Sequence, residues 1–200
     1  ACPACKLFGC TATASRIQFT DAKINAGYQS IYRDMIGIDR FTGGVYQGEA
    51  GGANMRVHVL ERTSFTSSVT VVNFELWQLG FLAYVFRDFK EGLVPIGFGK
   101  TKGFGLVKGD VEQISLSYPL GQGLGKIQHL GSLASEAERE RYGLHVVDPP
   151  ELGMTKDTPT GLELYETFSI TKDKMDDFWK CGAKAFNDYI SNLKPKESAA

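Results

Sequence analysis

The chain has 200 residues, 42% of them hydrophobic, and carries 22 lysines and arginines against 23 aspartates and glutamates. This length suffices for one domain with a substantial core, or for one domain with a long extension. No apolar run reaches the ~18 residues of a membrane span and no signal peptide is visible, so we expect a cytoplasmic protein without membrane contact. The net charge of −1 argues against a uniformly basic nucleic-acid-binding protein. The charge is uneven, however, with 12 basic against 9 acidic residues in 1–110 and 10 against 14 in 111–200, and this permits a basic surface on the first half.

Three of the four cysteines lie within the first ten residues, at Cys2, Cys5 and Cys10. Two thiolates two residues apart can both face one tetrahedral ion, so the C-x2-C-x4-C spacing favours a zinc site with Cys10 as a third ligand. The fourth ligand is open, and the candidates are a residue before Ala1 and the three histidines His58, His129 and His145. A redox C-x2-C pair and plain structural thiols are the alternatives. The fourth cysteine, Cys181, falls in an expected helix and is interpreted as a small buried hydrophobe.

Hydrophobic periodicity and β-branched residues predict the elements of the first 120 residues. Strands are expected over residues 15–20, 56–60, 65–75 and 111–118, and a helix over residues 76–89. Residues 25–54 are rich in glycine, tyrosine and small polar residues, which indicates an irregular excursion from the core for which a hairpin is one candidate. The predicted core order is therefore strand, strand, helix, glycine-rich loop, strand.

The glycine-rich loop interleaves its glycines with Lys100, Lys102, Phe98 and Phe104. Glycine permits positive φ and close backbone approach, and lysines beside exposed amides suit phosphate oxygens. A P-loop is excluded, because Val94 stands where its first glycine is required and because this loop leads from a helix to a strand. Two interpretations remain: a loop that holds an anionic polymer or nucleotide, and a plain glycine-rich connection with solvated lysines.

After residue 119 the character of the chain changes. We expect a glycine-rich linker at residues 121–125, a short charged helix at 132–141 and an amphipathic helix at 175–193. The last helix is expected to dock on the domain or on a neighbouring subunit.

Four segments, in this order, resemble the RAMP superfamily of CRISPR-associated proteins, particularly the backbone subunits of type III effector complexes. They are C-P-A-C-K-L-F-G at residues 2–9, A-S-R-I-Q-F-T-D-A at 14–22, I-D-R-F-T-G at 38–43 and the G-x-G-x-x-x-G-x-G loop at 97–105. The resemblance covers residues 1–118. It implies an α+β chain with a ferredoxin-like, RNA-recognition-motif-like core, a zinc knuckle at 1–13, a thumb hairpin within 25–56 and an RNA-contacting glycine-rich loop at 95–109. Residues 120–200 then form a linker and a C-terminal helical extension.

The resemblance also implies the partners: CRISPR RNA held along its backbone, target RNA, and other RAMP domains or subunits in a filament. Binding any guide sequence requires amides and cations at phosphates with aromatic rings for stacking. The expected RNA-binding residues are Arg33, Arg40, Gly97, Phe98, Gly99, Lys100, Lys102, Gly103, Phe104 and Gly105. For the two phenylalanines, a core role is the alternative to stacking.

The chain departs from the family at its start, since the first strand, first helix and the following loop precede the knuckle in other members. We therefore expect a piece of a longer, fused effector, or a partner that supplies the first half of the core. Family members that cut target RNA commonly use an aspartate on that early loop. Here Asp39 is the best substitute as a catalytic residue and Asp34 the second, while a turn formed by Asp39 and Arg40 is the structural alternative. Endoribonuclease activity is expected only within a whole effector, and a non-catalytic scaffold that recruits a protein through residues 120–200 is the competing function.

Overall fold

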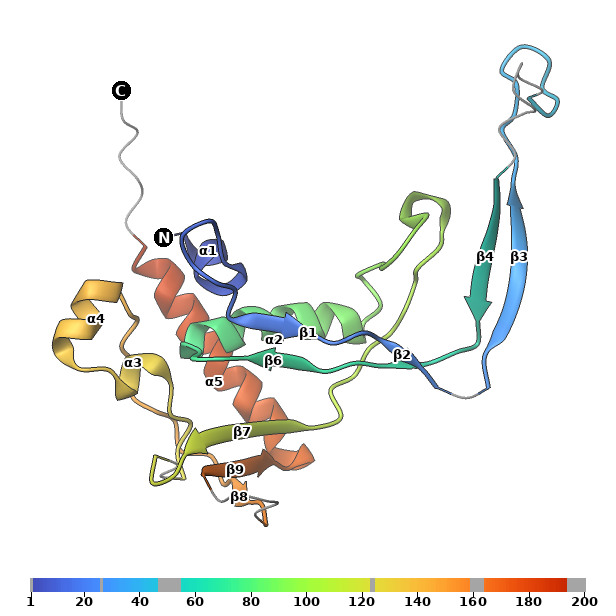
Figure 1. The fold of residues 1–200 in the computed structure, drawn as a ribbon. Helices are drawn as coiled ribbons and strands as arrows, with labels where there is room; N and C mark the ends of the chain where they lie inside the picture. The colour runs from blue at the N-terminus through green and yellow to red at the C-terminus, as the bar shows by residue number, and fades with distance from the viewer. Residues whose placement is uncertain (1, 26, 47–54, 123–124, 159–163, 194–200) are drawn as a thin grey trace, which may run out of the picture. The chain divides into compact units, whose positions relative to one another are not determined.

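The computed structural model describes residues 2–25, 27–46, 55–122, 125–158 and 164–193 (Figure 1). Helices and strands both contribute, which confirms the α+β class. The chain divides into two compact units: residues 1–16 with 72–200, called the core unit, and residues 17–71, called the hairpin unit.

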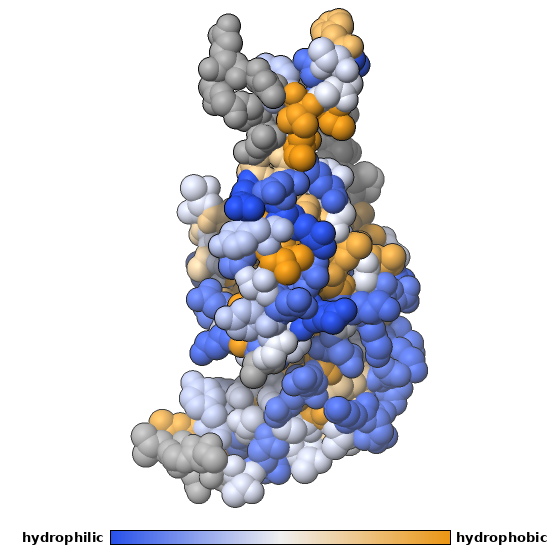
Figure 2. All heavy atoms as spheres, turned by 90° about the vertical axis from the view of Figure 1, so that its right-hand side faces the viewer, coloured by the Kyte–Doolittle hydropathy of each residue, from blue (hydrophilic) through white to orange (hydrophobic). Residues whose placement is uncertain are grey.

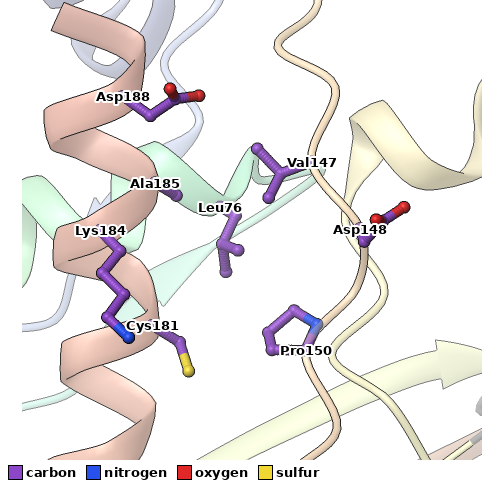
Figure 3. Close-up of a pocket in the computed structure, with 8 residues that line it drawn as sticks. All are labelled: Leu76, Val147, Asp148, Pro150, Cys181, Lys184, Ala185 and Asp188. Carbon is purple, nitrogen blue, oxygen red and sulfur yellow. The ribbon is translucent and has the colours of Figure 1, made fainter.

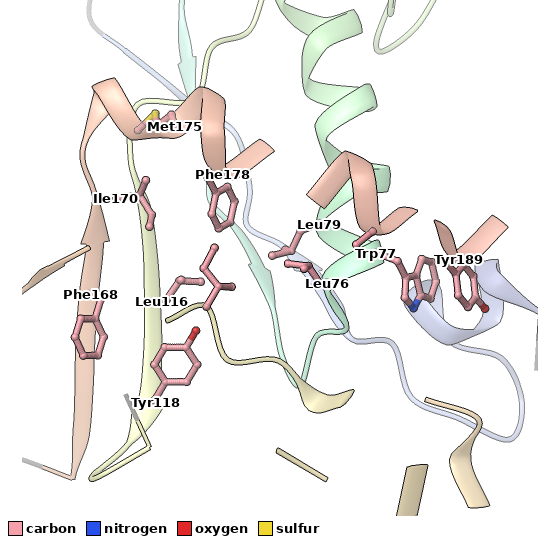
Figure 4. Packing of buried hydrophobic residues seen from close by; sticks show 12 residues of the cluster. Leu76, Trp77, Leu79, Leu116, Tyr118, Phe168, Ile170, Met175, Phe178 and Tyr189 are labelled. Atoms are coloured by element: carbon pink, nitrogen blue, oxygen red, sulfur yellow. The ribbon is translucent and has the colours of Figure 1, made fainter. Parts of the chain in front are cut away.

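The core unit contains all of the described helices. They are α1 (Pro3–Phe8), α2 (Leu76–Lys90), the 3-10 turn η1 (Lys100–Lys102), α3 (Leu130–Leu133), α4 (Glu136–Tyr142) and α5 (Lys172–Ser191). Its sheet has the order β7-β9-β8, all antiparallel, built from β7 (Ile114–Pro119), β8 (Thr155–Lys156) and β9 (Tyr165–Ile170). Apolar side chains of α2, α5, β7 and β9 form one buried cluster, in which Ile170 of β9 lies near Phe178 of α5 (Figure 4).

Helices α2 and α5 pack closely against each other, because a glycine in each removes the side chain where they meet. A Cβ built on Gly80 would lie 2.0 Å from the carbonyl oxygen of Gly182. Aromatic pairs flank this point, with Trp77 stacked on Tyr189 at 4.3 Å between ring centroids. The C-terminal segment is thus part of the core unit: β9 pairs with β7, and α5 covers α2.

The hairpin unit is one nested antiparallel ribbon. Its strands are β1 (Ile17–Phe19), β2 (Lys23–Ile24), β3 (Gln29–Met35), β4 (Met55–Glu61), β5 (Phe65–Thr66) and β6 (Val69–Val71), and they pair as β1 with β6, β2 with β5 and β3 with β4. Isolated pairing of Ile38 with Val45 continues the ribbon toward its tip. The hairpin that was one candidate structure for residues 25–54 is therefore present, although residues 47–54 lie outside the described part.

Several predicted boundaries are corrected. The helix expected at 76–89 is confirmed as α2, but the strand expected at 65–75 is wrong beyond Val71, because Asn73 adopts φ 48° and Glu75 caps α2. The strand expected from 111 begins at Ile114. The single helix expected at 132–141 is two helices, since Ser135 caps α4 with its side chain and so starts a new helix. The last helix begins at Lys172, earlier than expected, and the strand β9 before it was not predicted.

Candidate nucleic-acid interface

The glycine-rich loop of the core unit is closed by backbone hydrogen bonds. The amide of Ile96 donates to the carbonyl of Gly105 at 2.9 Å, and the amide of Lys102 donates to the carbonyl of Gly99 at 2.8 Å. Gly105 has φ 78°, and a Cβ on it would lie 1.8 Å from the carbonyl oxygen of Ile96. A glycine is therefore required at the base of the loop for conformation and for space. Gly97 and Gly103 also have positive φ, but open space surrounds their Cβ positions.

The two phenylalanines of the loop differ in their surroundings. Phe98 is 64% exposed. Phe104 is half-buried, and its ring lies 2.8 Å from the Cβ position of Gly99. Of the roles left open by the sequence, the structure therefore favours an internal packing role for Phe104 and leaves the ring of Phe98 accessible to a ligand.

Cations gather along this loop and next to it. Lys100 and Lys102 occupy η1 and are exposed. At the base of the loop, Lys90 lies 3.7 Å from the carboxylate of Asp110, so its charge is partly offset. The loop thus presents an exposed aromatic ring and exposed ammonium groups on a backbone with fixed turns, a combination suited to single-stranded nucleic acid.

In the hairpin unit, Asp39 forms a turn. Its carboxylate accepts hydrogen bonds from the amides of Phe41 at 2.7 Å and Thr42 at 2.9 Å, and these bonds lower the pKa of Asp39. A carboxylate held this way is a weak base, so the geometry favours the turn role over the catalytic one. Asp34, the second candidate, lies 3.0 Å from Arg56 in an ion pair.

The two arginines expected to bind RNA lie in different parts of the ribbon. Arg33 is in β3 and forms an ion pair with Glu61 of β4 at 2.9 Å. Arg40 follows Asp39 in the turn and is exposed. Beside it, Phe41 is 96% exposed, and hydrophobic side chains gather toward the tip of the ribbon, at the top of the view in Figure 2.

A stack of side chains on β3 and β4 was not expected. The rings of Tyr32 and His58 are 4.8 Å apart at 18° between planes, and the guanidinium carbon of Arg56 is 5.3 Å from the centroid of Tyr32. From the sequence, His58 is expected only as a candidate zinc ligand. The alternation of residues 55–60 could have indicated that Arg56 and His58 share one face, but not which residues of β3 lie opposite them.

The three N-terminal cysteines lie close together at α1. The sulfurs of Cys2 and Cys5 are 3.1 Å apart, and their hydrogen bond lowers the pKa of Cys2 and raises that of Cys5. A hydrogen bond with the Thr13 hydroxyl lowers the pKa of the Cys10 thiol. Two thiolates on one tetrahedral zinc stand roughly 3.8 Å apart. The thiol donors are of a type that suits zinc, but the sulfurs of Cys2 and Cys5 lie closer together than on a zinc ion, and no group of three or more potential ligands in the described ranges is arranged to hold an ion.

The two histidines of the core unit, His129 and His145, form hydrogen bonds within that unit. The Nε2 atom of His129 bonds the carbonyl of Val147 at 2.9 Å, and burial lowers the pKa of this histidine. The Nε2 atom of His145 lies 2.9 Å from the carboxylate of Asp188. Both contacts use Nε2, and the Nδ1 atoms of the two rings are buried without a hydrogen-bond partner among the described residues. A metal-binding histidine commonly donates its other ring N–H to a carbonyl or a carboxylate, so these contacts are compatible with a ligand role.

A buried carboxylate that the sequence analysis missed anchors the cysteine segment. Glu75 is fully buried; its carboxylate bonds the Arg16 guanidinium at 3.2 Å and the His145 amide at 2.8 Å. The side-chain amide of Gln78 donates to the carbonyl of Lys6 at 3.1 Å. These bonds join residues 6–16 to the start of α2, so the orientation of the cysteine segment is fixed by the core unit.

A small apolar pocket of about 260 Å³ lies between α5 and residues 147–150 (Figure 3). Leu76, Val147, Pro150 and Ala185 give it an apolar lining, and Cys181 is half-buried in its wall, more exposed than expected. None of the residues expected to bind RNA or metal lines this pocket.

Comparison with protein families shows the superfamily of the chain. The model of the RAMP superfamily matches residues 1–108, more than half of the chain, and the chain belongs to this superfamily. RAMP proteins are generally CRISPR-associated, bind RNA and work in multi-subunit complexes. The matched region includes the three N-terminal cysteines, the hairpin unit and the glycine-rich loop up to Lys108. A search of the curated proteins finds no match. Among the described helices, none is long and apolar enough to cross a membrane.

Proposed function

We propose that this chain is a guide-RNA-binding backbone domain of a type III RNA-targeting effector. The observation that carries the proposal is the glycine-rich loop, which combines a closed base, the exposed ring of Phe98 and the exposed ammonium of Lys100. Amides and ammonium groups contact the phosphates, and the ring stacks on a base. None of these contacts depends on base identity, and a guide of any sequence requires this tolerance.

The hairpin unit is proposed as the thumb that interrupts the guide–target duplex. Its turn is held by Asp39, and the neighbouring Phe41 protrudes almost completely into solvent. An exposed apolar side chain on a held turn can wedge between bases and unstack them. In this proposal Asp39 shapes the tip and does not cleave RNA, and any cleavage occurs elsewhere in the effector.

The core unit is proposed to have a ferredoxin-like arrangement completed from its own C-terminal segment. In such a fold the last strand pairs with the first, and the first strand leads into a helix beside the second helix. Here β7 pairs antiparallel with β9, which runs directly into α5 against α2. We thus assign β9 and α5 the place of the first strand and helix that precede the knuckle in other members.

Zinc is proposed as a structural ion held by Cys2, Cys5 and Cys10. The ion would cross-link α1 to the turn after it. Adding zinc to the metal-free chain should raise the thermal unfolding midpoint, and Cys5→Ala should remove that increase.

Reversing the charge of two lysines tests whether the glycine-rich loop binds RNA. Lys100→Glu with Lys102→Glu should weaken binding of a single-stranded RNA and flatten the dependence of log affinity on log salt. Arg141→Glu with Lys184→Glu, exposed on α4 and α5, makes the same change of total charge away from the loop and serves as the control. Equal affinities for wild type and the loop variant would overturn the proposal. They would favour the competing function, a scaffold that recruits a protein near the pocket of α5 and residues 147–150.

A further inference from the structure

The paired strands β3 and β4 have two chemically different faces. Side chains alternate along a strand, so Tyr32 and Asp34 share a face with their cross-strand partners His58 and Arg56. The opposite face carries apolar pairs, Ile31 opposite Val59 and Met35 opposite Met55, with Arg33 and Glu61 among them. The first set is here called the stack face and the second the apolar face.

The stack face holds its aromatic and cationic groups in one orientation. Ser30 and His58 are joined through a hydrogen bond between the hydroxyl and Nε2. The ring of Tyr32 stacks against His58 and lies under the Arg56 guanidinium, and Asp34 bonds Nε of Arg56 at 3.0 Å. Tyr32 is 64% exposed, and the side chain of Arg56 is 68% exposed. The groups are thus preorganised and accessible to a ligand.

We infer that the stack face is a second RNA contact, in which Tyr32 and His58 receive a nucleobase and Arg56 receives the adjoining phosphate. This inference rests on the proposed function and adds residues to it. A guanidinium uses Nε and its two terminal nitrogens as separate donors, so the bond from Nε to Asp34 leaves the terminal nitrogens for a phosphate. Aromatic rings and guanidinium planes both stack on bases of any identity, so the ligand is single-stranded RNA without sequence preference.

The two arginines of the ribbon are expected to contribute differently to RNA binding. Arg33 and Arg56 each form one ion pair, with Glu61 and Asp34 respectively, but on opposite faces. Neutralising either one changes the total charge equally. A difference between them in RNA binding therefore reports the face that contacts RNA rather than the charge of the chain.

The test uses the full chain and a single-stranded RNA that carries 2-aminopurine, whose fluorescence is quenched on stacking. Arg56→Gln should weaken binding more than Arg33→Gln does, and equal losses in the two variants would count against a contact specific to the stack face. Tyr32→Leu should weaken binding by at least about fivefold, which is the smaller end of one base–aromatic stack, and should remove the protein-induced quenching. Tyr32→Phe keeps the ring and should behave as wild type.

The controls distinguish folding from binding. A cross-strand aromatic pair also stabilises a hairpin, so the amide spectrum of each variant is compared with that of wild type, and His58→Ala provides a second route to the same stack. Wild-type affinity and quenching in Tyr32→Leu, His58→Ala and Arg56→Gln would overturn the inference, while a loss in the Lys100 and Lys102 variant would leave the proposed function standing. No binding by the wild-type chain would overturn both.

Discussion

Gly80→Ala should destabilise the chain, although helix propensity alone predicts the reverse. Alanine is favoured over glycine within a helix by about 1 kcal/mol. At Gly80, however, the new Cβ would lie 2.0 Å from the carbonyl oxygen of Gly182 and 2.8 Å from Cβ of Phe186. Since Cβ atoms essentially never approach within 3.0 Å of another heavy atom, α2 and α5 would have to separate locally by about 1 Å.

The cost of this separation can be estimated from the packing that it disturbs. A gap of 0.5–1 Å loses roughly a quarter to a half of the dispersion energy of each contact. The contacts at risk include the Trp77–Tyr189 stack and the Phe86–Trp179 pair, on either side of the crossing. Overpacking costs typically about 1–3 kcal/mol. Taking about 3 kcal/mol for a clash with backbone, less about 1 kcal/mol gained in propensity, the net destabilisation is about 2 kcal/mol.

Thermal unfolding followed by circular dichroism measures this effect. For a chain of this size, about 2 kcal/mol lowers the unfolding midpoint by roughly 4–8 °C. Gly153→Ala is the matched control, because the nearest atom to its Cβ is Cε of Lys174 at 3.9 Å, and its effect should stay within about 0.5 kcal/mol. A midpoint for Gly80→Ala equal to or above that of Gly153→Ala would refute the close packing of α2 on α5.

Three further predictions concern the loop, the turn and the buried carboxylate. Gly105→Ala should reduce RNA affinity more than Gly103→Ala, because both positions have positive φ but only Gly105 is blocked by backbone; equal losses in RNA titrations would contradict this. Since two amides lower the pKa of Asp39, its turn should be most stable above the ordinary carboxyl pKa and should loosen as pH falls through the lowered value. Amide chemical shifts of the turn report this, and a titration that Asp39→Asn leaves unchanged would be inconsistent with it. Arg16→Ala leaves the buried Glu75 without its cation and should cost about 3–5 kcal/mol in urea unfolding, whereas a cost below about 1 kcal/mol would show that the hydrogen bond from the His145 amide suffices.

Local patterns predicted the elements that depend on near neighbours. Helix α2 follows from apolar residues at helical spacing, and the RAMP motifs predicted the superfamily correctly. The hairpin was only a candidate, because the pairing of β3 with β4 joins residues at least twenty positions apart, and short polar and glycine-rich segments carry little periodicity.

The role of the second half was harder to predict, since it depends on contacts between distant segments. Strand β9 has only six residues, and its alternation of Phe168 and Ile170 with polar residues is too short to be distinctive. Its partner β7 precedes it by about fifty residues. The glycines at the contact of α2 with α5 did not predict that contact either. An isolated glycine within a helical pattern indicates a less stable helix, unless the residue that packs against it is known.

For the candidate site, the sequence supplied residue types but not their surroundings. Phe98 and Phe104 are equivalent in the motif, and only the fold makes one exposed and the other half-buried. Likewise, Asp39 was open to two roles until its hydrogen bonds with the amides of Phe41 and Thr42 were seen. Glu75 was assigned to the end of a strand, because nothing nearby in the sequence indicates its pairing with Arg16.

The central claim, that the glycine-rich loop binds RNA, is tested most directly by photo-cross-linking. A single-stranded RNA containing 4-thiouridine would be cross-linked to the full chain, and the modified peptides mapped by mass spectrometry. The proposal predicts cross-links at the exposed Phe98 within the loop, and their loss when Lys100 and Lys102 are replaced by glutamate. Cross-links confined to α4, α5 and the segment between them, with none at residues 97–105, would contradict it.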